Sequence, residues 1–266
     1  MDRRSLFETA ATLGLGALAA SGLPGCALPG AEQRGAKTPF NVPLTTIPSV
    51  GSEPVFPVRR IHCIGRNHAG HAREMGSDPT REPRFFFQKP TDAIQNVAPG
   101  TVSDHPYPPL TKNYHDEVER VAALHTGGRN IPISTALDHV HADALGLDMT
   151  PRDLQRAMGD EKKPWEIGKS FDHSAPIGPL HCATQTGPFT QGASWLKVNR
   201  QLKQDANLDQ MIWRVAEQIN KLSEAFELMP NDIVCSGTPE NLGPAVKGDV
   251  IECHIDGLPN LSVKIV

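Results

Sequence analysis

Three carboxylates, Glu117, Glu119 and Asp148, are the residues in this sequence best suited to chemistry. Side chains alternate between the two faces of a β-strand, so a strand over residues 115–124 places Glu117 and Glu119 on one face. Two carboxylates on one face repel each other unless a cation lies between them, and a hard divalent ion such as Mg²⁺ prefers oxygen ligands. Asp148, at the end of an apolar strand over residues 144–148, would be the third ligand. The alternative is a solvated strand face that carries two glutamates.

A second pair, His71 and Glu74, has the spacing of a catalytic dyad. A helix capped by Asn67 and ending at Gly76 places the two side chains one turn apart on the same face. The carboxylate would then stabilise the imidazolium that forms when His71 takes a proton from water. The alternative is a surface ion pair that contributes only about 0.2–0.5 kcal/mol.

Two lysines are placed where they could contact an anionic substrate. Lys89 ends a short apolar strand just before Pro90, and Lys169 is expected at a strand end near Asp148. The alternative for Lys89 is a solvated strand end. Asp153 has a structural explanation instead, because Thr150 as N-cap and Pro151 at the first position predict that a helix starts there.

The composition indicates one globular domain built mainly from short strands. Of the 266 residues, 38% are hydrophobic and 21% charged, while aromatic residues make up 5%. The 23 glycines and 24 prolines favour many turns over a helix bundle. An amphipathic helix is expected over residues 209–226 and a closing hairpin around Asp256–Gly257. The net charge of −4, with no basic run, argues against nucleic acid as a partner.

The N-terminus differs from the rest of the chain. Arg3 and Arg4 precede a short apolar run that ends at Cys26, which predicts a twin-arginine export signal over residues 1–26. Lipid attachment at Cys26 would be the only membrane contact. Residues 27–55 are expected to form a linker and extended arm, and residues 56–266 the catalytic domain. The alternative is a leader without a targeting function on a cytoplasmic protein.

Six short stretches occur in the order typical of one family. The chain resembles the fumarylacetoacetate hydrolase family over residues 56–266, and within it the bacterial enzymes that hydrolyse fumarylpyruvate. The stretches that carry the resemblance are Gly65-Arg66-Asn67-His68-Ala69-Gly70-His71-Ala72-Arg73-Glu74-Met75, Phe87-Gln88-Lys89-Pro90, Glu117-Val118-Glu119, Leu147-Asp148-Met149-Thr150-Pro151-Arg152-Asp153-Leu154-Gln155, Lys169-Ser170-Phe171-Asp172 and Gly237-Thr238-Pro239.

The resemblance implies a fold, an assembly and a set of site residues. The fold would be α+β, a mixed β-roll with flanking short helices, and the protein a homodimer. Mg²⁺ or Mn²⁺ would be held by Glu117, Glu119 and Asp148, with His71 and Glu74 activating water on a lid helix. Lys169 would act in catalysis, and the substrate would be contacted by Arg66, Lys89, Arg152, Gln155 and Thr238.

The implied reaction is hydrolysis of a carbon–carbon bond in an acylpyruvate. Fumarylpyruvate, a 2-oxo acid, would yield fumarate and pyruvate, with the metal and Lys169 stabilising negative charge on the substrate oxygens. Decarboxylation of a 2-oxo acid such as oxaloacetate and keto–enol isomerisation share the same enolate and stay open as alternatives. A further alternative is an exported dicarboxylate-binding relative without turnover.

The sequence departs from the family pattern in three places. His68 stands where Tyr is usual, and His141-Ala142-Asp143 replaces an aromatic-Gly-Tyr segment. Arg120 stands where an apolar residue is usual, on the face opposite the two glutamates. Burial of its guanidinium without a partner would cost several kcal/mol. These departures bear on substrate choice and stability.

Overall fold

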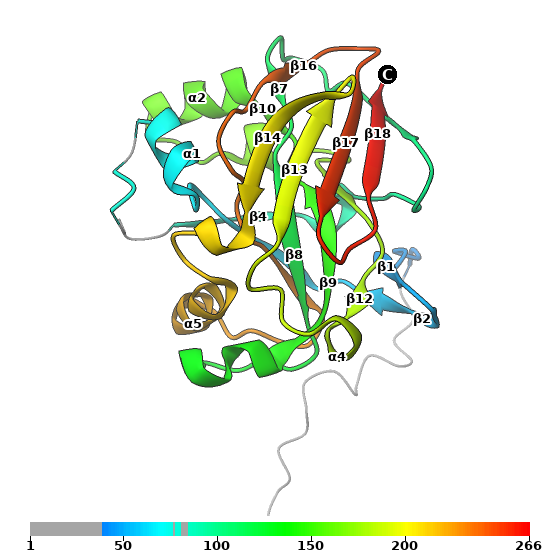
Figure 1. Ribbon diagram of the computed structural model, residues 1–266, viewed down its shortest axis with the longest axis vertical. Helices are drawn as coiled ribbons and strands as arrows, with labels where there is room; N and C mark the ends of the chain where they lie inside the picture. The colour runs from blue at the N-terminus through cyan, green and yellow to red at the C-terminus, as the bar shows by residue number, and fades with distance from the viewer. Residues whose placement is uncertain (1–38, 77, 81–84) are drawn as a thin grey trace, which may run out of the picture. The chain divides into compact units, whose positions relative to one another are not determined.

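The computed structural model of the chain describes residues 39–76, 78–80 and 85–266. Residues Pro43–Val266 form one compact unit that contains all the elements discussed below (Figure 1). In the part of the chain that is described, no helix is long and apolar enough to span a membrane. The expected export signal lies outside the described residues and stays a prediction, as does the homodimer.

The largest sheet in the described chain has eight strands and mixes parallel with antiparallel pairing. Its central strands, β8 and β9, are antiparallel neighbours. Of the acidic residues singled out above, Glu119 lies in β8, Glu117 directly precedes β8 and Asp148 directly follows β9, so the strand expected over residues 115–124 is interrupted at residues 116 and 117. The order across the sheet is β4 (Phe86–Lys89), β3 (Arg60–Ile64), β15 (Asp232–Cys235), β8 (Val118–Leu124), β9 (Val140–Leu147), β11 (Ala175–Ile177) and β5 (Ile94–Asn96), with β12 (His181–Cys182) also paired to β9.

A five-stranded sheet lies beside the largest one (Figure 1). Its order is β14 (Gln201–Asn207), β13 (Ala193–Val198), β17 (Val250–Ile255), β18 (Leu261–Ile265) and β6 (Ser103–His105). The predicted closing hairpin is present as β17 and β18. Two smaller sheets pair β10 (Thr150–Pro151), β7 (Tyr114–His115) and β16 (Pro244–Ala245), and β1 (Thr46–Ser49) with β2 (Ser52–Pro57).

The β1–β2 hairpin belongs to the compact unit although it lies inside the expected extended arm. Ile47 is fully buried and Phe56 nearly so, and both pack with Ile61, Val121 and Ile233 on one face of the largest sheet. The compact unit therefore begins about a dozen residues before residue 56, because two apolar side chains anchor this segment to the core.

The helices of the described chain are short and lie around the sheets. They are α1 (Ala69–Glu74), α2 (Arg152–Asp160), α3 (Glu166–Lys169), α4 (Ala183–Thr186) and α5 (Val215–Ala225), with 3₁₀ turns η1 (Thr91–Ala93), η2 (Ile133–His139) and η3 (Leu208–Gln210). In Figure 1, α1 and α2 lie side by side, and α5 and the η2 segment lie at the opposite end of the sheets.

Helix α5 is shorter than the predicted helix over residues 209–226. Met211 forms an isolated β-bridge with His68, and the Ile212 N–H donates to the Asn67 carbonyl at 2.7 Å. Because the backbone of residues 211 and 212 is paired with another segment, it cannot join the helix. The apolar spacing from Val215 onward is as predicted, with Ile219 and Leu222 fully buried.

Three local predictions from the sequence are wrong. Asn67 does not cap α1, because His68 occupies the N-cap while the Asn67 amide donates to the Trp213 and Ser236 carbonyls at 2.9 and 2.7 Å. Thr150 does not cap α2, because it lies in β10 and Pro151 takes the cap position. Lys169 ends helix α3, not a strand.

Candidate active site

The pairing of β8 with β9 brings the three predicted carboxylates together. Glu119 pairs with Gly146 in the ladder, and just beyond its last pair the Asp148 N–H donates to the Glu117 carbonyl at 2.9 Å. One oxygen from each of Glu117, Glu119 and Asp148 lies within 4.8 Å of the others, and all three residues are buried. The predicted convergence of these side chains is therefore present.

Glycines provide the space that the acidic group needs. A Cβ atom on Gly146 would lie 2.7 Å from Val121 Cγ2, so a larger residue opposite Glu119 would force the strands apart. Gly237 has a φ of +91°, and its N–H donates to Glu119 Oε2 at 3.0 Å. This left-handed conformation suits glycine and lets the loop after β15 approach the carboxylate.

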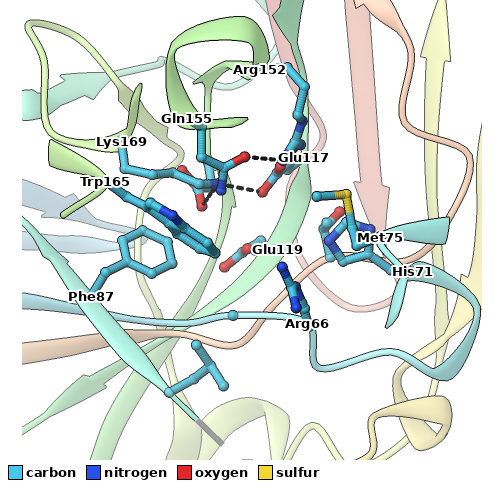
Figure 2. Close-up of a pocket in the computed structure, with 14 residues that line it drawn as sticks. Arg66, His71, Met75, Phe87, Glu117, Glu119, Arg152, Gln155, Trp165 and Lys169 are labelled. Carbon is cyan, nitrogen blue, oxygen red and sulfur yellow. Dashed lines mark hydrogen bonds and ion pairs between the residues drawn. The ribbon is translucent and has the colours of Figure 1, made fainter. Parts of the chain in front are cut away.

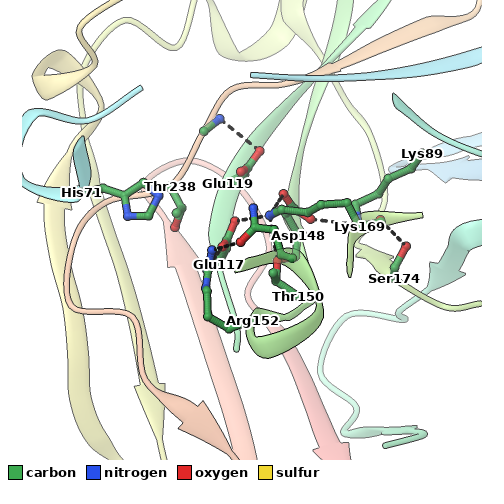
Figure 3. A network of polar contacts seen from close by, with 12 residues as sticks. His71, Lys89, Glu117, Glu119, Asp148, Thr150, Arg152, Lys169, Ser174 and Thr238 are labelled. Atoms are coloured by element: carbon green, nitrogen blue, oxygen red, sulfur yellow. Dashed lines mark hydrogen bonds and ion pairs between the residues drawn. The ribbon is translucent and has the colours of Figure 1, made fainter. Parts of the chain in front are cut away.

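Buried cations contact two of the three carboxylates (Figure 3). Lys169 Nζ donates to Glu117 Oε2 at 2.9 Å and to Asp148 Oδ2 at 2.7 Å, and also to the Thr150 hydroxyl at 2.7 Å. The Arg152 guanidinium pairs with the other oxygen of Glu117. Among the described residues no cationic side chain contacts Glu119, whose hydrogen-bond partner is the Gly237 N–H.

Because cations contact Glu117 but not Glu119 in the described chain, the pKa values of the two glutamates shift in opposite directions. Burial opposes ionisation of Glu117, but Lys169 and Arg152 outweigh it and hold the pKa of that carboxyl well below its usual range. Burial, together with the charges of Asp148 and Glu117, raises the pKa of Glu119 well above its usual value. Burial alone would lower the pKa of Lys169, yet Asp148 and Glu117 raise it, so the ammonium stays charged.

The donor set suits a divalent cation. Three carboxylate oxygens close together are the hard ligands that Mg²⁺ and Mn²⁺ bind, and Glu119 is the carboxylate that lacks a compensating positive charge within the described chain. An ion at this point would relieve the repulsion that raises the Glu119 pKa. The geometry therefore fits the predicted ligands.

The predicted dyad faces the same site from helix α1. His71 Nδ1 lies 3.5 Å from Glu74 Oε2, a distance of electrostatic contact slightly longer than a good hydrogen bond. His71 is 5% exposed, and burial lowers its pKa below the ordinary 6.5 despite the opposing charge of Glu117. The imidazole is therefore neutral near pH 7, the state in which it can accept a proton.

A narrow cavity of about 20 Å³ joins the carboxylates to the dyad histidine. Figure 2 shows Arg66, His71 and Gln155 directed toward this space, with Phe87 and Trp165 as an apolar wall. The predicted site residues that line the cavity are Arg66, His71, Glu117, Glu119, Asp148, Arg152, Gln155, Lys169 and Thr238. Glu74 does not line this cavity but contacts His71.

Lys89 does not reach the cavity where a substrate carboxylate was expected. Its ammonium lies 2.8 Å from Asp148 Oδ1, donates to the Lys169 carbonyl and is 3% exposed. The antiparallel pairing of β4 with β3 directs this side chain underneath Asp148. Its position supports orientation of that carboxylate and not direct contact with substrate.

Two of the departures from the family pattern compensate each other. Arg120 is buried, but its guanidinium has partners. Its Nε donates to Asp143 Oδ1 at 2.7 Å and its Nη1 donates to the Phe189 carbonyl at 2.6 Å. Asp143 is fully buried on the neighbouring strand β9. The expected cost of an unpaired guanidinium therefore does not arise, because position 143 supplies its counter-charge.

Sequence reasoning missed Gln204, a buried residue on β14. Its Oε1 accepts from the Val118 N–H at 3.2 Å, between the two glutamates. Its Nε2 donates to Thr238 Oγ1 at 3.1 Å and to the carbonyls of Pro239 and Glu240 at 2.9 and 3.2 Å. A polar residue at an inward position of a strand was the available signal, but its partners lie far away in sequence.

Comparison with known proteins identifies relatives of both the sequence and the fold. Residues 60–266 match the family described as fumarylacetoacetate (FAA) hydrolase C-terminal. The crystal structure of fumarylpyruvate hydrolase from Pseudomonas aeruginosa in complex with Mn²⁺ and pyruvate superposes with a TM-score of 0.85 at 49% identity, covering 86% of this chain and 99% of that one.

Curated relatives carry more than one activity in their names. The fumarylpyruvate hydrolase of a Ralstonia species is 37% identical over 71% of this chain and 95% of its own length. The mitochondrial oxaloacetate decarboxylase of Dictyostelium discoideum is 35% identical over 75% of this chain and 90% of its own. The mitochondrial oxaloacetate tautomerase of the mouse is 33% identical, with coverages of 78% and 91%.

Proposed function

Since the chain belongs to the fumarylacetoacetate hydrolase family and is most like its fumarylpyruvate hydrolases, we propose that it hydrolyses a carbon–carbon bond in acylpyruvates, with fumarylpyruvate as the substrate. The observation that carries the proposal is the meeting of a neutral, buried His71 with three carboxylates and a charged Lys169 around one cavity. This combination provides a base, a cation site and an electrophilic group within reach of one small molecule.

Glu117, Glu119 and Asp148 would hold a divalent ion, Mg²⁺ or Mn²⁺, which when bound supplies Lewis-acid stabilisation of negative charge on the substrate oxygens. Lys169 adds positive charge at the same point from the end of α3. Arg152 and Gln155, one turn apart on α2, both line the cavity and can orient the 2-oxo acid.

His71 carries out the proton transfers. Its imidazole takes a proton from a water molecule, and the carboxylate of Glu74 stabilises the resulting imidazolium. The water oxygen bonds to the distal carbonyl carbon of the acylpyruvate. When that tetrahedral species collapses, the carbon–carbon bond breaks and its electron pair forms the enolate of pyruvate, which can recover the proton from His71. The products are fumarate and pyruvate.

Oxaloacetate chemistry is the second candidate. Relatives named as oxaloacetate decarboxylase and oxaloacetate tautomerase match this chain about as well as the Ralstonia fumarylpyruvate hydrolase does. Decarboxylation, tautomerisation and hydrolysis can share an enolate, so the same cation site and lysine serve all three. A binding protein without turnover is disfavoured by the preserved contact between His71 and Glu74.

A turnover assay separates these functions. Purified protein with Mn²⁺ or Mg²⁺ is mixed with fumarylpyruvate or with oxaloacetate, and loss of the enol absorbance and formation of pyruvate are followed. We expect metal-dependent hydrolysis of fumarylpyruvate that EDTA abolishes. The His71→Ala variant should lose at least about a hundredfold in kcat while its Mn²⁺ affinity changes less than about twofold, since His71 is a base and not a ligand.

Two outcomes would contradict the proposal. Turnover of oxaloacetate alone would assign the decarboxylase or tautomerase activity instead. Binding of fumarylpyruvate without any metal-dependent turnover would favour the dicarboxylate-binding protein. A large loss of Mn²⁺ binding in His71→Ala would show that the roles of histidine and carboxylates are assigned wrongly.

A further inference from the structure

A wider cavity lies next to the narrow one, and the charged side chains of its wall are mainly cationic. It measures about 670 Å³ and shares the lining residues Arg66, Met75, Gln155 and Trp165 with the inner cavity, so the two cavities are adjacent. Figure 2 shows these four side chains at the inner cavity. Four cations line the wider space, Arg66, Arg156, Lys162 and Lys163, against two carboxylates, Glu74 and Asp160.

Two of these cations are available to a ligand. Lys163 is paired with Glu161, and Glu74 is in contact with His71. Within the described part of the chain, the exposed side chains of Arg156 and Lys162 have no ion pair or hydrogen bond. An unpaired guanidinium and an unpaired ammonium at the mouth of an anion-binding site attract a second negative charge.

Helix α2 sets the distance between the two ends of the site. Arg152 contacts Glu117 at the inner end, Gln155 lines both cavities and Arg156 faces the outer one. Arg156 lies one helical turn beyond Arg152, which is about 6 Å farther along the axis. The wall between the two ends includes the apolar side chains of Met75 and Trp165, which suit a hydrocarbon segment.

We propose that Arg156 and Lys162 bind a terminal carboxylate on the acyl group and so select acylpyruvates that end in a second anion. The inference rests on the proposed acylpyruvate hydrolysis and adds the residues that determine its acyl specificity. With the 2-oxo acid at the three carboxylates, the extended four-carbon acyl group of fumarylpyruvate carries its distal carboxylate to the outer cavity. Oxaloacetate is three carbons shorter, so its second carboxylate stays in the inner cavity.

The test compares three substrates in Arg156→Gln, Lys162→Gln and the double variant. For fumarylpyruvate, kcat/KM should fall about three- to fivefold in each single variant and about tenfold in the double, mainly through a higher KM, because partly exposed ion pairs are modest contributors. For acetylpyruvate, whose acyl group is neutral, and for oxaloacetate, the change should stay below about twofold. Lys247→Gln, an exposed cation remote in sequence, is the matched control.

The result that overturns the inference is an equal loss for fumarylpyruvate and acetylpyruvate, or no loss for either, while both are hydrolysed. If the wild-type protein hydrolyses neither compound, the proposed function is wrong. The role of Arg156 and Lys162 is then tested by measuring the affinity for each compound. Calorimetric titration of the Mn²⁺-loaded protein should then show tighter binding of fumarylpyruvate than of acetylpyruvate, and the double variant should remove the difference. Equal affinities in the wild-type protein would reject the specificity role.

Discussion

At the scale of single residues, the site is defined by where positive charge is missing. Lys169 and Arg152 neutralise Glu117, and Lys89 and Lys169 neutralise Asp148. Glu119 accepts only a backbone hydrogen bond within the described chain, and burial beside two other carboxylates raises its pKa well above the usual value. In the absence of a cation Glu119 is therefore the one of the three carboxyls whose protonated form is most favoured.

Metal binding should consequently release a proton. Because a carboxylate must be deprotonated to act as a ligand, Mn²⁺ should displace the proton that the raised pKa of Glu119 favours. Calorimetric titrations of Mn²⁺ in two buffers of different ionisation enthalpy measure this proton release directly. Glu119→Gln should bind Mn²⁺ more weakly and release no proton. Identical heats in both buffers for the wild-type protein would contradict the assignment.

At the scale of elements, the site depends on a connection between strands that belong to different sheets. Gln204 projects from β14 and joins Val118, at the start of β8, to the segment from Thr238 to Glu240 that follows β15. The carboxyl group of Glu240 packs against Gly70 of helix α1, since a Cβ atom there would lie 2.1 Å from Glu240 Cδ. One amide thus links the acidic strand to the loop that contacts the dyad helix.

Replacement of Gln204 should impair catalysis more than it impairs folding. Gln204→Leu removes the partner of the Val118 N–H, of two carbonyls and of the Thr238 hydroxyl, at a cost of about 1–3 kcal/mol. Displacement of Glu117, Glu119 and the dyad helix by a fraction of an ångström should lower kcat by about tenfold or more. The measurements are kcat with fumarylpyruvate and the melting temperature.

The strand offers its own controls for this prediction. Gln201→Leu changes an exposed glutamine on the same strand and should leave kcat unchanged. Gln204→Glu keeps the acceptor for Val118 but loses the donor to the loop, so it should recover part of the activity. If the Gln204→Leu protein had a normal kcat and a lower melting temperature, Gln204 would have a purely structural role.

At the scale of the whole molecule, buried histidines make stability depend on pH. Burial, aided by the charge of His71, lowers the pKa of His68 to about 3. Burial also lowers the pKa of His105 to about 4, with a contribution from His173. In the unfolded chain a histidine has its ordinary pKa of about 6.5 and binds a proton that the folded state excludes. Stability is therefore lost as the pH falls below 6.5.

The His68→Phe variant tests this effect. His68 is 3% exposed, so the folded protein cannot readily protonate it. The free energy of unfolding of the wild-type protein should therefore fall by about 1–2 kcal/mol between pH 7 and pH 5 because of this histidine. Urea denaturation at both pH values should show a smaller loss of unfolding free energy in His68→Phe. His125→Phe, at an exposed histidine, should behave like the wild type. An identical pH dependence in both variants would show that His68 is accessible to protons.

The sequence alone determined those features that depend on local periodicity. The two-residue repeat of a strand puts Glu117 and Glu119 on one face, and the helical repeat puts His71 beside Glu74. The alternation of apolar and polar residues likewise predicted the closing hairpin, and apolar residues spaced by three or four predicted the core face of α5. The convergence of Asp148 with the glutamates was predicted because its apolar strand ends at that residue, although its register could only be assumed.

Only the tertiary structure decided which distant segments become neighbours. Strand order places Lys89 under Asp148, Asp143 beside Arg120 and Gln204 between two loops. No local pattern carries this information, because a one-residue change of register would turn each side chain to the opposite face. The same holds for Arg156 and Lys162, whose importance follows from the cavity that α1 and α2 enclose together and not from their positions in the chain.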